Sequence, residues 1–118
     1  MKTFLAVYLG SASSAQRSKW DKLDEASRKA RESSGMKAWG DWMVKHKGSV
    51  VTQGGPLGKT KRASSKGIED TKNNLSGFVI VQAESHDAAA LMFANHPAFM
   101  IFPGEAVEIM ECLPIPGQ

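Results

Sequence analysis

Four short runs of apolar residues along the chain have the character of β-strands. They cover residues 3–9, 50–53, 78–83 and 106–113 and are rich in β-branched and aromatic residues. Two longer regions, one after the first run and one after the third, have apolar residues at the spacing of amphipathic helices. The order strand, helix, strand, strand, helix, strand predicts an α+β fold with a ferredoxin-like β-α-β-β-α-β antiparallel sheet.

The first helical region is predicted to form two pieces. Ser18, followed three residues later by Asp21, suits a helix start, and the helix is expected to loosen at residues 33–35, where two serines precede a glycine. Gly48 is the expected stop of the second piece. This second piece carries a stripe of large side chains at helical spacing: Met36, Trp39, Met43 and His46.

The second helical region is predicted to begin after Ser85, which suits an N-cap position, and to end at Pro97. Residues 57–74, between the second and third strands, are too many for a simple connection, so part of them is expected to form an extra hairpin. The basic residues of this segment favour either a mobile flap that draws in an anionic ligand or an exposed edge that positive charge protects from pairing. These residues are Lys59, Lys61, Arg62 and Lys66.

Both faces of the predicted sheet are apolar. In the first strand, alternate residues point to opposite sides: Phe4, Ala6 and Tyr8 to one, and Leu5, Val7 and Leu9 to the other. The chain has enough helix for only one covering layer. A second copy of the chain is the simplest cover for the other face, so we expect a homodimer joined through the sheets.

Composition narrows the function classes. A length of 118 residues predicts a single domain over residues 1–118. The net charge of +3 is too small an excess to imply a nucleic-acid partner. Cys112 is the only cysteine, and the three histidines are far apart, so no disulfide, metal site or cofactor is predicted. This cysteine usage fits the cytoplasm.

The N-terminal segment has two interpretations. An apolar run at residues 4–9, followed by small residues at 11–15, imitates a secretory signal with its cleavage site. The run is short and contains Tyr8, so a first β-strand is the preferred prediction. No apolar run approaches the roughly 18 residues that a membrane span needs, and no membrane partner is predicted.

Several short motifs follow one another in a recognisable order. They are Gly54-Gly55-Pro56-Leu57, Asp70-Thr71-Lys72, Leu75-Ser76-Gly77-Phe78-Val79-Ile80, Glu84-Ser85-His86-Asp87-Ala88-Ala89, His96-Pro97 and Val107-Glu108-Ile109-Met110. In this order the chain resembles the YCII-related proteins, and within them the DGPF-type branch, which belong to the dimeric α/β-barrel superfamily. The resemblance covers most of the chain after Gly48, together with the first strand, and implies a dimeric α/β barrel.

Two features depart from the pattern of that family. Residues 65–68 read Ser-Lys-Gly-Ile where the motif that names the DGPF branch would stand. The better-known YCII members share a His-Asp pair proposed as catalytic, with the His just after the first strand, whereas this chain has Gly10, Ser11 and Ala12 there. The pair is not carried over, and the resemblance implies the fold and the dimer only.

Three residues are candidates for proton transfer: His96, Asp41 and Glu108. His96, before Pro97, could hydrogen-bond the last free carbonyls of the preceding helix, or act as a general base if it faces the sheet. Glu108 shares a strand face with Met110, and is either a buried carboxylate that needs a partner or an ordinary exposed side chain at the sheet edge.

Six residues are candidates for ligand binding: Tyr8, Trp39, Trp42, Met43, Lys59 and Arg62. The first four are predicted to line a pocket between sheet and helices, with core or dimer packing as the alternative for the tryptophans and Met43. The two basic residues are predicted to recruit an anionic group, with a solvated rim as the alternative.

Two functions from different classes therefore remain open. In the first, the domain is an enzyme or a binder of a small molecule held between sheet and helices. In one version of this hypothesis the molecule is anionic. In the second, it is a non-catalytic dimeric interaction or sensing module whose large side chains only pack. Polar groups that converge in an apolar cleft would favour the first function, and a filled core would favour the second.

Overall fold

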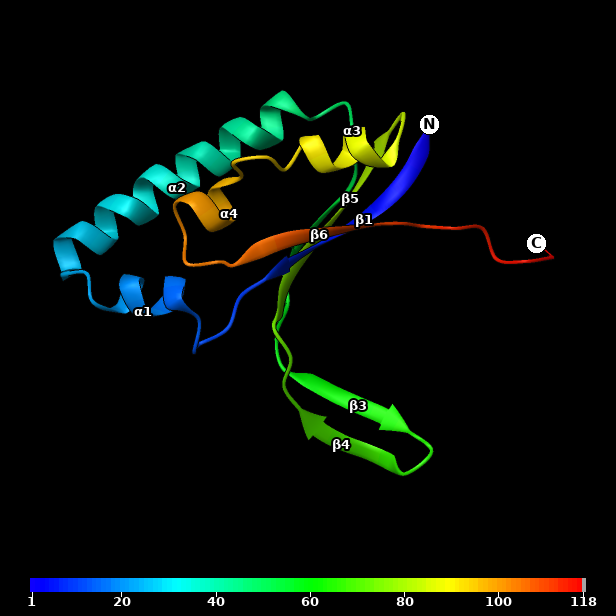
Figure 1. The fold of residues 1–118 in the computed structure, drawn as a ribbon, viewed down its shortest axis with the longest axis horizontal. Coiled ribbons are helices and arrows are strands. Elements are labelled where there is room, and N and C mark those ends of the chain that lie inside the picture. Colours follow the sequence, from blue (N-terminus) through cyan, green and yellow to red (C-terminus); the bar gives the residue numbers. More distant parts are fainter. Residues whose placement is uncertain (118) are drawn as a thin grey trace.

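The chain folds into a four-stranded antiparallel sheet with helices against one face, as the computed structural model shows for residues 1–117 (Figure 1). The strands are β1 (Lys2–Leu9), β2 (Val50–Pro56), β5 (Leu75–Ala83) and β6 (Ala106–Glu111), in the spatial order β2-β5-β1-β6. The helices are α1 (Ala15–Asp21), α2 (Glu25–Lys45), α3 (His86–Leu91) and α4 (Pro97–Met100). The predicted α+β fold and its ferredoxin-like strand order are confirmed.

The first helical region is divided at a different place from the one predicted. Helix α1 begins after Ser14, whose hydroxyl accepts a hydrogen bond from the backbone N–H of Arg17 at 3.0 Å, and not at Ser18. Helix α2 begins after Asp24, whose carboxylate accepts from the N–H of Ser27 at 2.6 Å. It then runs unbroken through residues 33–35, so the predicted loosening there is wrong.

The second helical region is also shorter than predicted. Helix α3 ends at Leu91, and a separate turn, α4, begins at Pro97. Asn95, between them, has a positive φ of 58°, a left-handed conformation that α-helices do not continue through. His96 is consequently the N-cap of α4 and does not cap the carbonyl end of the preceding helix, as one interpretation proposed.

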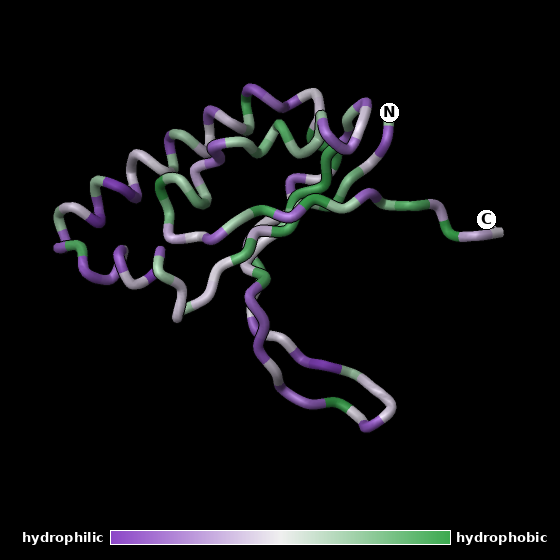
Figure 2. The backbone as a smooth tube through the Cα atoms, in the orientation of Figure 1, coloured by the Kyte–Doolittle hydropathy of each residue, from purple (hydrophilic) through white to green (hydrophobic). Residues whose placement is uncertain are grey.

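The long segment between β2 and β5 forms the predicted extra hairpin, here called the arm, which consists of β3 (Thr60–Ser64) and β4 (Gly67–Thr71). The arm projects away from the sheet and the helices (Figure 1). Figure 2 shows that it is mostly hydrophilic, whereas hydrophobic residues concentrate in the central strands. Two exposed ion pairs, Lys61–Asp70 and Arg62–Glu69, bridge its strands.

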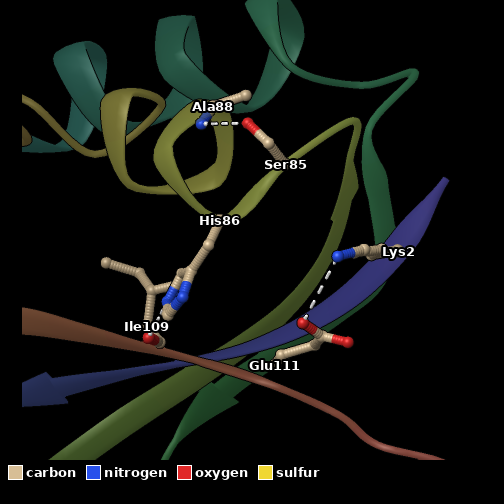
Figure 3. Close-up of polar contacts among 6 residues, drawn as sticks. All are labelled: Lys2, Ser85, His86, Ala88, Ile109 and Glu111. Atoms are coloured by element: carbon tan, nitrogen blue, oxygen red, sulfur yellow. Dashed lines mark hydrogen bonds and ion pairs between the residues drawn. The ribbon is translucent and has the colours of Figure 1, made fainter.

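The end of the sheet nearest α3 is held by polar contacts (Figure 3). His86, the first residue of α3, lies 2.7 Å through its Nε2 from the carbonyl oxygen of Ile109 in β6. A carbonyl only accepts, so Nε2 of His86 carries the proton and donates it. Lys2 and Glu111 form an ion pair at 3.8 Å across β1 and β6, and Ser85 caps α3 by accepting from the N–H of Ala88.

The core lies between the sheet and the helices. Its members are Phe4, Ala6, Tyr8, Trp42, Val79, Val81, Ala83, Ala89, Phe93 and Ala98. The strand register places the alternate residues of the sheet on the other face, which no helix covers (Figure 1). We call it the open face; it includes Leu5, Val7, Leu9, Phe78, Ile80, Glu108 and Met110.

None of the helices within residues 1–117 combines the length and the apolar character needed to cross a bilayer.

Candidate functional site

A cleft of about 550 Å³ lies between α2 and the β2 side of the sheet. The α2 wall is made by Met36, Trp39, Gly40 and Met43, and the sheet wall by Tyr8, residues 53–56 and residues 76–79. Most of this lining is apolar, and among residues 1–117 none of the lining side chains is charged. The volume falls within the range of sites that hold small organic molecules.

Tyr8 connects this cleft to a buried histidine. It comes from β1 on the helix-facing side of the sheet, is 7% exposed, and lines the cleft. Its hydroxyl oxygen lies 3.5 Å from Nε2 of His96, a side chain with no exposed surface. This is a long hydrogen bond, of the kind that often tightens when a ligand binds.

His96 is surrounded by aromatic rings. The ring of Trp39 stands perpendicular to it, with centroids 4.7 Å apart, and those of Trp42 and Tyr8 lie 4.9 and 5.3 Å away. Phe93 stacks on it at 5.8 Å. Such a shell supplies packing and few hydrogen-bonding groups, so the two ring nitrogens depend on their two specific partners.

One of these partners determines the tautomer of His96. Nδ1 lies 3.0 Å from the backbone N–H of Ala98, which can only donate, so Nδ1 must be the unprotonated nitrogen. The proton of the neutral imidazole therefore resides on Nε2 and is donated to the hydroxyl oxygen of Tyr8. Nε2 thus has no free lone pair for a substrate, which argues against His96 as a general base.

Burial reinforces the neutral state of this pair. Desolvation, with a smaller contribution from His46, lowers the pKa of His96 to about 4. Desolvation also raises the pKa of Tyr8 to about 12. Near neutral pH the cleft therefore presents an uncharged phenol supported by an uncharged imidazole.

The two tryptophans predicted for the pocket lie in different environments. Trp39 lines the cleft and lies against the rings of Tyr8 and His96. Trp42 is 8% exposed, is not part of the cleft lining, and donates its indole N–H to the carbonyl of Met92 at 2.7 Å, which ties α2 to the end of α3. Trp42 thus has a packing environment, whereas Met43 joins Trp39 at the cleft.

The other predicted site residues lie apart from the cleft lining. Asp41 is exposed on α2 and paired with Lys37 at 3.1 Å. Glu108 is exposed on the open face, opposite the helices and His96. Lys59 precedes β3, and Arg62 is on β3 and engaged with Glu69 at 2.7 Å. Of the predicted site residues, Tyr8, Trp39 and Met43 line the cleft. His96 contacts the rings of Tyr8, Trp39 and Trp42.

Sequence reasoning missed the glycine-rich wall of the cleft. Gly54 has a positive φ of 64°, and a side chain there would overlap the backbone carbonyl of Phe78. Gly77 lies close to both Gly55 and the ring of Tyr8. The available signal was the Gly-Gly-Pro run at residues 54–56 after a predicted strand, which can indicate a close backbone approach as well as a turn.

In the part of the chain that the structure describes, no three His, Cys, Asp or Glu side chains converge so that they could hold a metal ion.

No protein-family model matches this sequence, and no curated protein is significantly similar to it. One solved structure with a similar fold is 5-chloro-2-hydroxyhydroquinone dehydrochlorinase from Burkholderia phenoliruptrix AC1100, determined in complex with 2,5-dihydroxybenzoquinone. The similarity has a TM-score of 0.52 at 18% sequence identity and covers 92% of this chain and 90% of the other. At this identity it establishes a shared fold type, and membership of the YCII-related family stays a prediction.

Proposed function

We propose that the chain binds a small aromatic molecule, as a binding protein or an enzyme, in the cleft between α2 and the sheet. One observation carries this proposal: a mostly apolar cleft of about 550 Å³ is lined by Tyr8, whose hydroxyl is hydrogen-bonded to a fully buried neutral histidine. The core behind the cleft is filled, but the cleft itself is open space bounded by Trp39, Met43 and Phe78.

The structural neighbour supports the size and type of ligand. That protein is a 5-chloro-2-hydroxyhydroquinone dehydrochlorinase, and the molecule bound to it is 2,5-dihydroxybenzoquinone. Both compounds are single six-membered rings with oxygen substituents. A ring of this size suits a cleft whose lining includes Trp39 and Tyr8. These two aromatic side chains pack against each other, with ring centroids 5.1 Å apart. The same fold is consistent with a distant relationship to the YCII-related proteins.

Binding is tested by filling the cleft from α2. A Cβ atom added at Gly40 meets no atom within 4 Å, and Gly40 belongs to the cleft lining, so Gly40→Leu is expected to place its side chain in the site. Val44→Leu, one turn later at a 76%-exposed position outside the lining, is the matched control.

We expect phenol, hydroquinone or catechol, which are uncharged near neutral pH, to raise the melting temperature of the parent protein and of Val44→Leu, but not of Gly40→Leu. Quenching of tryptophan fluorescence provides a second signal, because Trp39 lies at the cleft. A parent protein that responds to none of these rings would contradict the proposal, as would an equal response of Gly40→Leu.

A second candidate, a non-catalytic dimeric module, is favoured by the open face. On the side without helices, Leu5, Phe78 and Ile80 are partly exposed, and Val7 beside them is 8% exposed. Apolar side chains gathered on one face commonly mark an interaction site. A second copy of the chain is its proposed partner. The two proposals are compatible, because α2 forms one wall of the cleft whereas the open face is the side without helices; Phe78 belongs to both.

A further inference from the structure

We infer that the Tyr8 hydroxyl donates a hydrogen bond to the ligand, so that the cleft selects an uncharged ring carrying an oxygen acceptor such as a ketone or quinone carbonyl. This inference rests on the proposed small-molecule function and specifies the ligand class of the same cleft.

The first step is the direction of the hydrogen bond between Tyr8 and His96. If the phenol donated to Nε2, that nitrogen would need a free lone pair, and the imidazole proton would have to reside on Nδ1. The Nδ1 proton would then face the backbone N–H of Ala98 at 3.0 Å, and two donors would oppose each other in a buried site. His96 therefore donates, and the oxygen of Tyr8 accepts.

The second step concerns the proton of the phenol. Within residues 1–117, His96 is the single hydrogen-bond partner of the Tyr8 hydroxyl. The histidine donates to a lone pair of the hydroxyl oxygen, so the hydroxyl proton has no acceptor among these residues. A largely buried O–H group without an acceptor carries a desolvation cost. Tyr8 belongs to the cleft lining. A ligand acceptor that reaches its hydroxyl from the cleft would remove that cost, while a ligand that offers only a donor would not.

The third step concerns charge. No Lys, Arg or His side chain is among the cleft lining of residues 1–117, so a carboxylate or phosphate would lose its hydration without gaining a counter-charge. The hydrogen bond from His96 polarises the phenol and strengthens it as a donor. A ring with an uncharged carbonyl oxygen needs no counter-charge and accepts a hydrogen bond from the phenol. This ligand class therefore differs from the anionic one expected from the sequence.

The test compares two nearly isosteric probes. Acetophenone has a carbonyl oxygen where α-methylstyrene has a CH₂ group, and neither molecule is charged. We expect the parent protein to bind acetophenone roughly 3- to 10-fold more tightly, the effect of one net hydrogen bond. In Tyr8→Phe this preference should disappear, while the affinity for α-methylstyrene stays the same and shows that the cleft is intact.

The tautomer of His96 is measured separately, without ligand, by long-range ¹H–¹⁵N correlation spectra of histidine-labelled protein. An Nε2–H signal for His96 is expected, and an Nδ1–H signal would overturn the inference. Equal affinity for the two probes, or a preference that persists in Tyr8→Phe, would overturn the inference and leave the proposed function standing. Failure of the parent to bind either probe or any of the hydroxylated rings would overturn both.

Discussion

The side chain of His96 caps α4, packs among the aromatic rings of the core and hydrogen-bonds Tyr8, which lines the cleft. Its imidazole has no exposed surface, and burial lowers its pKa to about 4 from an ordinary value of 6.5. The folded state therefore prefers the neutral form, whereas the unfolded chain takes up a proton as the pH falls through 6.5. The stability that His96 contributes is complete above pH 6.5 and is lost between pH 6.5 and pH 4.

This predicts a pH-dependent stability with a defined cause. Between pH 7 and pH 4 the free energy of unfolding should fall by roughly 2–3 kcal/mol on account of His96. His96→Asn provides the comparison, because Asn can keep the acceptor for Ala98 as a favoured N-cap residue and does not titrate. Urea unfolding at several pH values measures the free energy of unfolding of the parent and of His96→Asn. An equal decrease in the two proteins would contradict the assignment to His96.

Two glycines in α2 give a matched pair for stability. An added methyl group at Gly40 meets no atom within 4 Å, whereas at Gly35 it would lie 2.5 Å from the ring of Phe102, which also packs near Trp20 and Trp39. Gly40→Ala should raise the free energy of unfolding by about 0.5–1 kcal/mol, the intrinsic difference within a helix.

Gly35→Ala gains the same helix propensity as Gly40→Ala, but its methyl group forces the Phe102 ring to move. We expect it to lower the free energy of unfolding by about 1 kcal/mol, because overpacking costs more than the helix gains. Thermal and urea denaturation of the two variants measure the difference. A Gly35→Ala protein as stable as Gly40→Ala would show that Phe102 yields easily.

At the residue scale, prediction from the sequence succeeded where the helical spacing allowed a single placement of a side chain. The spacing of Trp39 and Met43 predicted a shared helical surface, and both line the cleft. Trp42 lies one position before Met43 and three after Trp39, so periodicity alone could not tell which ring would face the cleft and which would pack against α3. Its buried bond to the carbonyl of Met92 is a long-range contact, and no local pattern encodes it.

At the scale of elements, the arm is the part of the chain most independent of the rest. Its strands β3 and β4 pair only with each other, and residues 61–70 are all exposed. Its ion pairs lie at the surface, where such pairs contribute little to stability. The core should therefore not depend on the arm.

We predict that residues 59–73 can be replaced by a short turn containing Asn-Gly with a change of less than about 1 kcal/mol in the free energy of unfolding. The turn would join Gly58 to Asn74, near the existing backbone hydrogen bond between Leu57 and Ser76. Urea unfolding checks this, and loss of the cooperative transition would contradict it. If inorganic phosphate stabilises the parent but not this variant, the predicted anion recruitment by Lys59 and Arg62 gains support.

The boundaries of the helices show why elements are easier to predict than their ends. The serine–glycine sequence at residues 33–35 predicts a break, but close contact with the ring of Phe102 makes Gly35 fit the continuous helix. The actual break, after Asp21, depends on the Asp24 cap. The first outcome depends on tertiary packing that competes with a weak local preference, and the second on a local cap at Asp24 that competes with the one predicted at Ser18.

At the scale of the whole molecule, the chain is broader than a compact domain of its length. Its radius of gyration is 16.3 Å, compared with about 13–14 Å expected for a compact chain of 118 residues. The arm and the C-terminal residues, which include Leu113 at 73% and Ile115 at 67% exposure, extend away from the sheet (Figure 1). Such extensions suit contacts with another chain. The strand alternation predicted the two apolar faces, and the second copy that would cover the open face stays a prediction.

The final prediction is that two copies associate through their open faces. Leu5 lies at the centre of this face, flanked by Ile80 on β5 and by Met110 on β6, which is 41% exposed. Ile80→Lys and Met110→Lys would place a charge in the interface, where it would lose its hydration without a partner. Leu91→Lys, at a 73%-exposed position on α3 on the helix side, is the control.

Sedimentation velocity at micromolar concentration should give a dimer for the parent and for Leu91→Lys, and a monomer for the two open-face variants, with cooperative unfolding in all four. A monomeric parent would contradict the prediction, and dissociation of Leu91→Lys would move the interface to the helices.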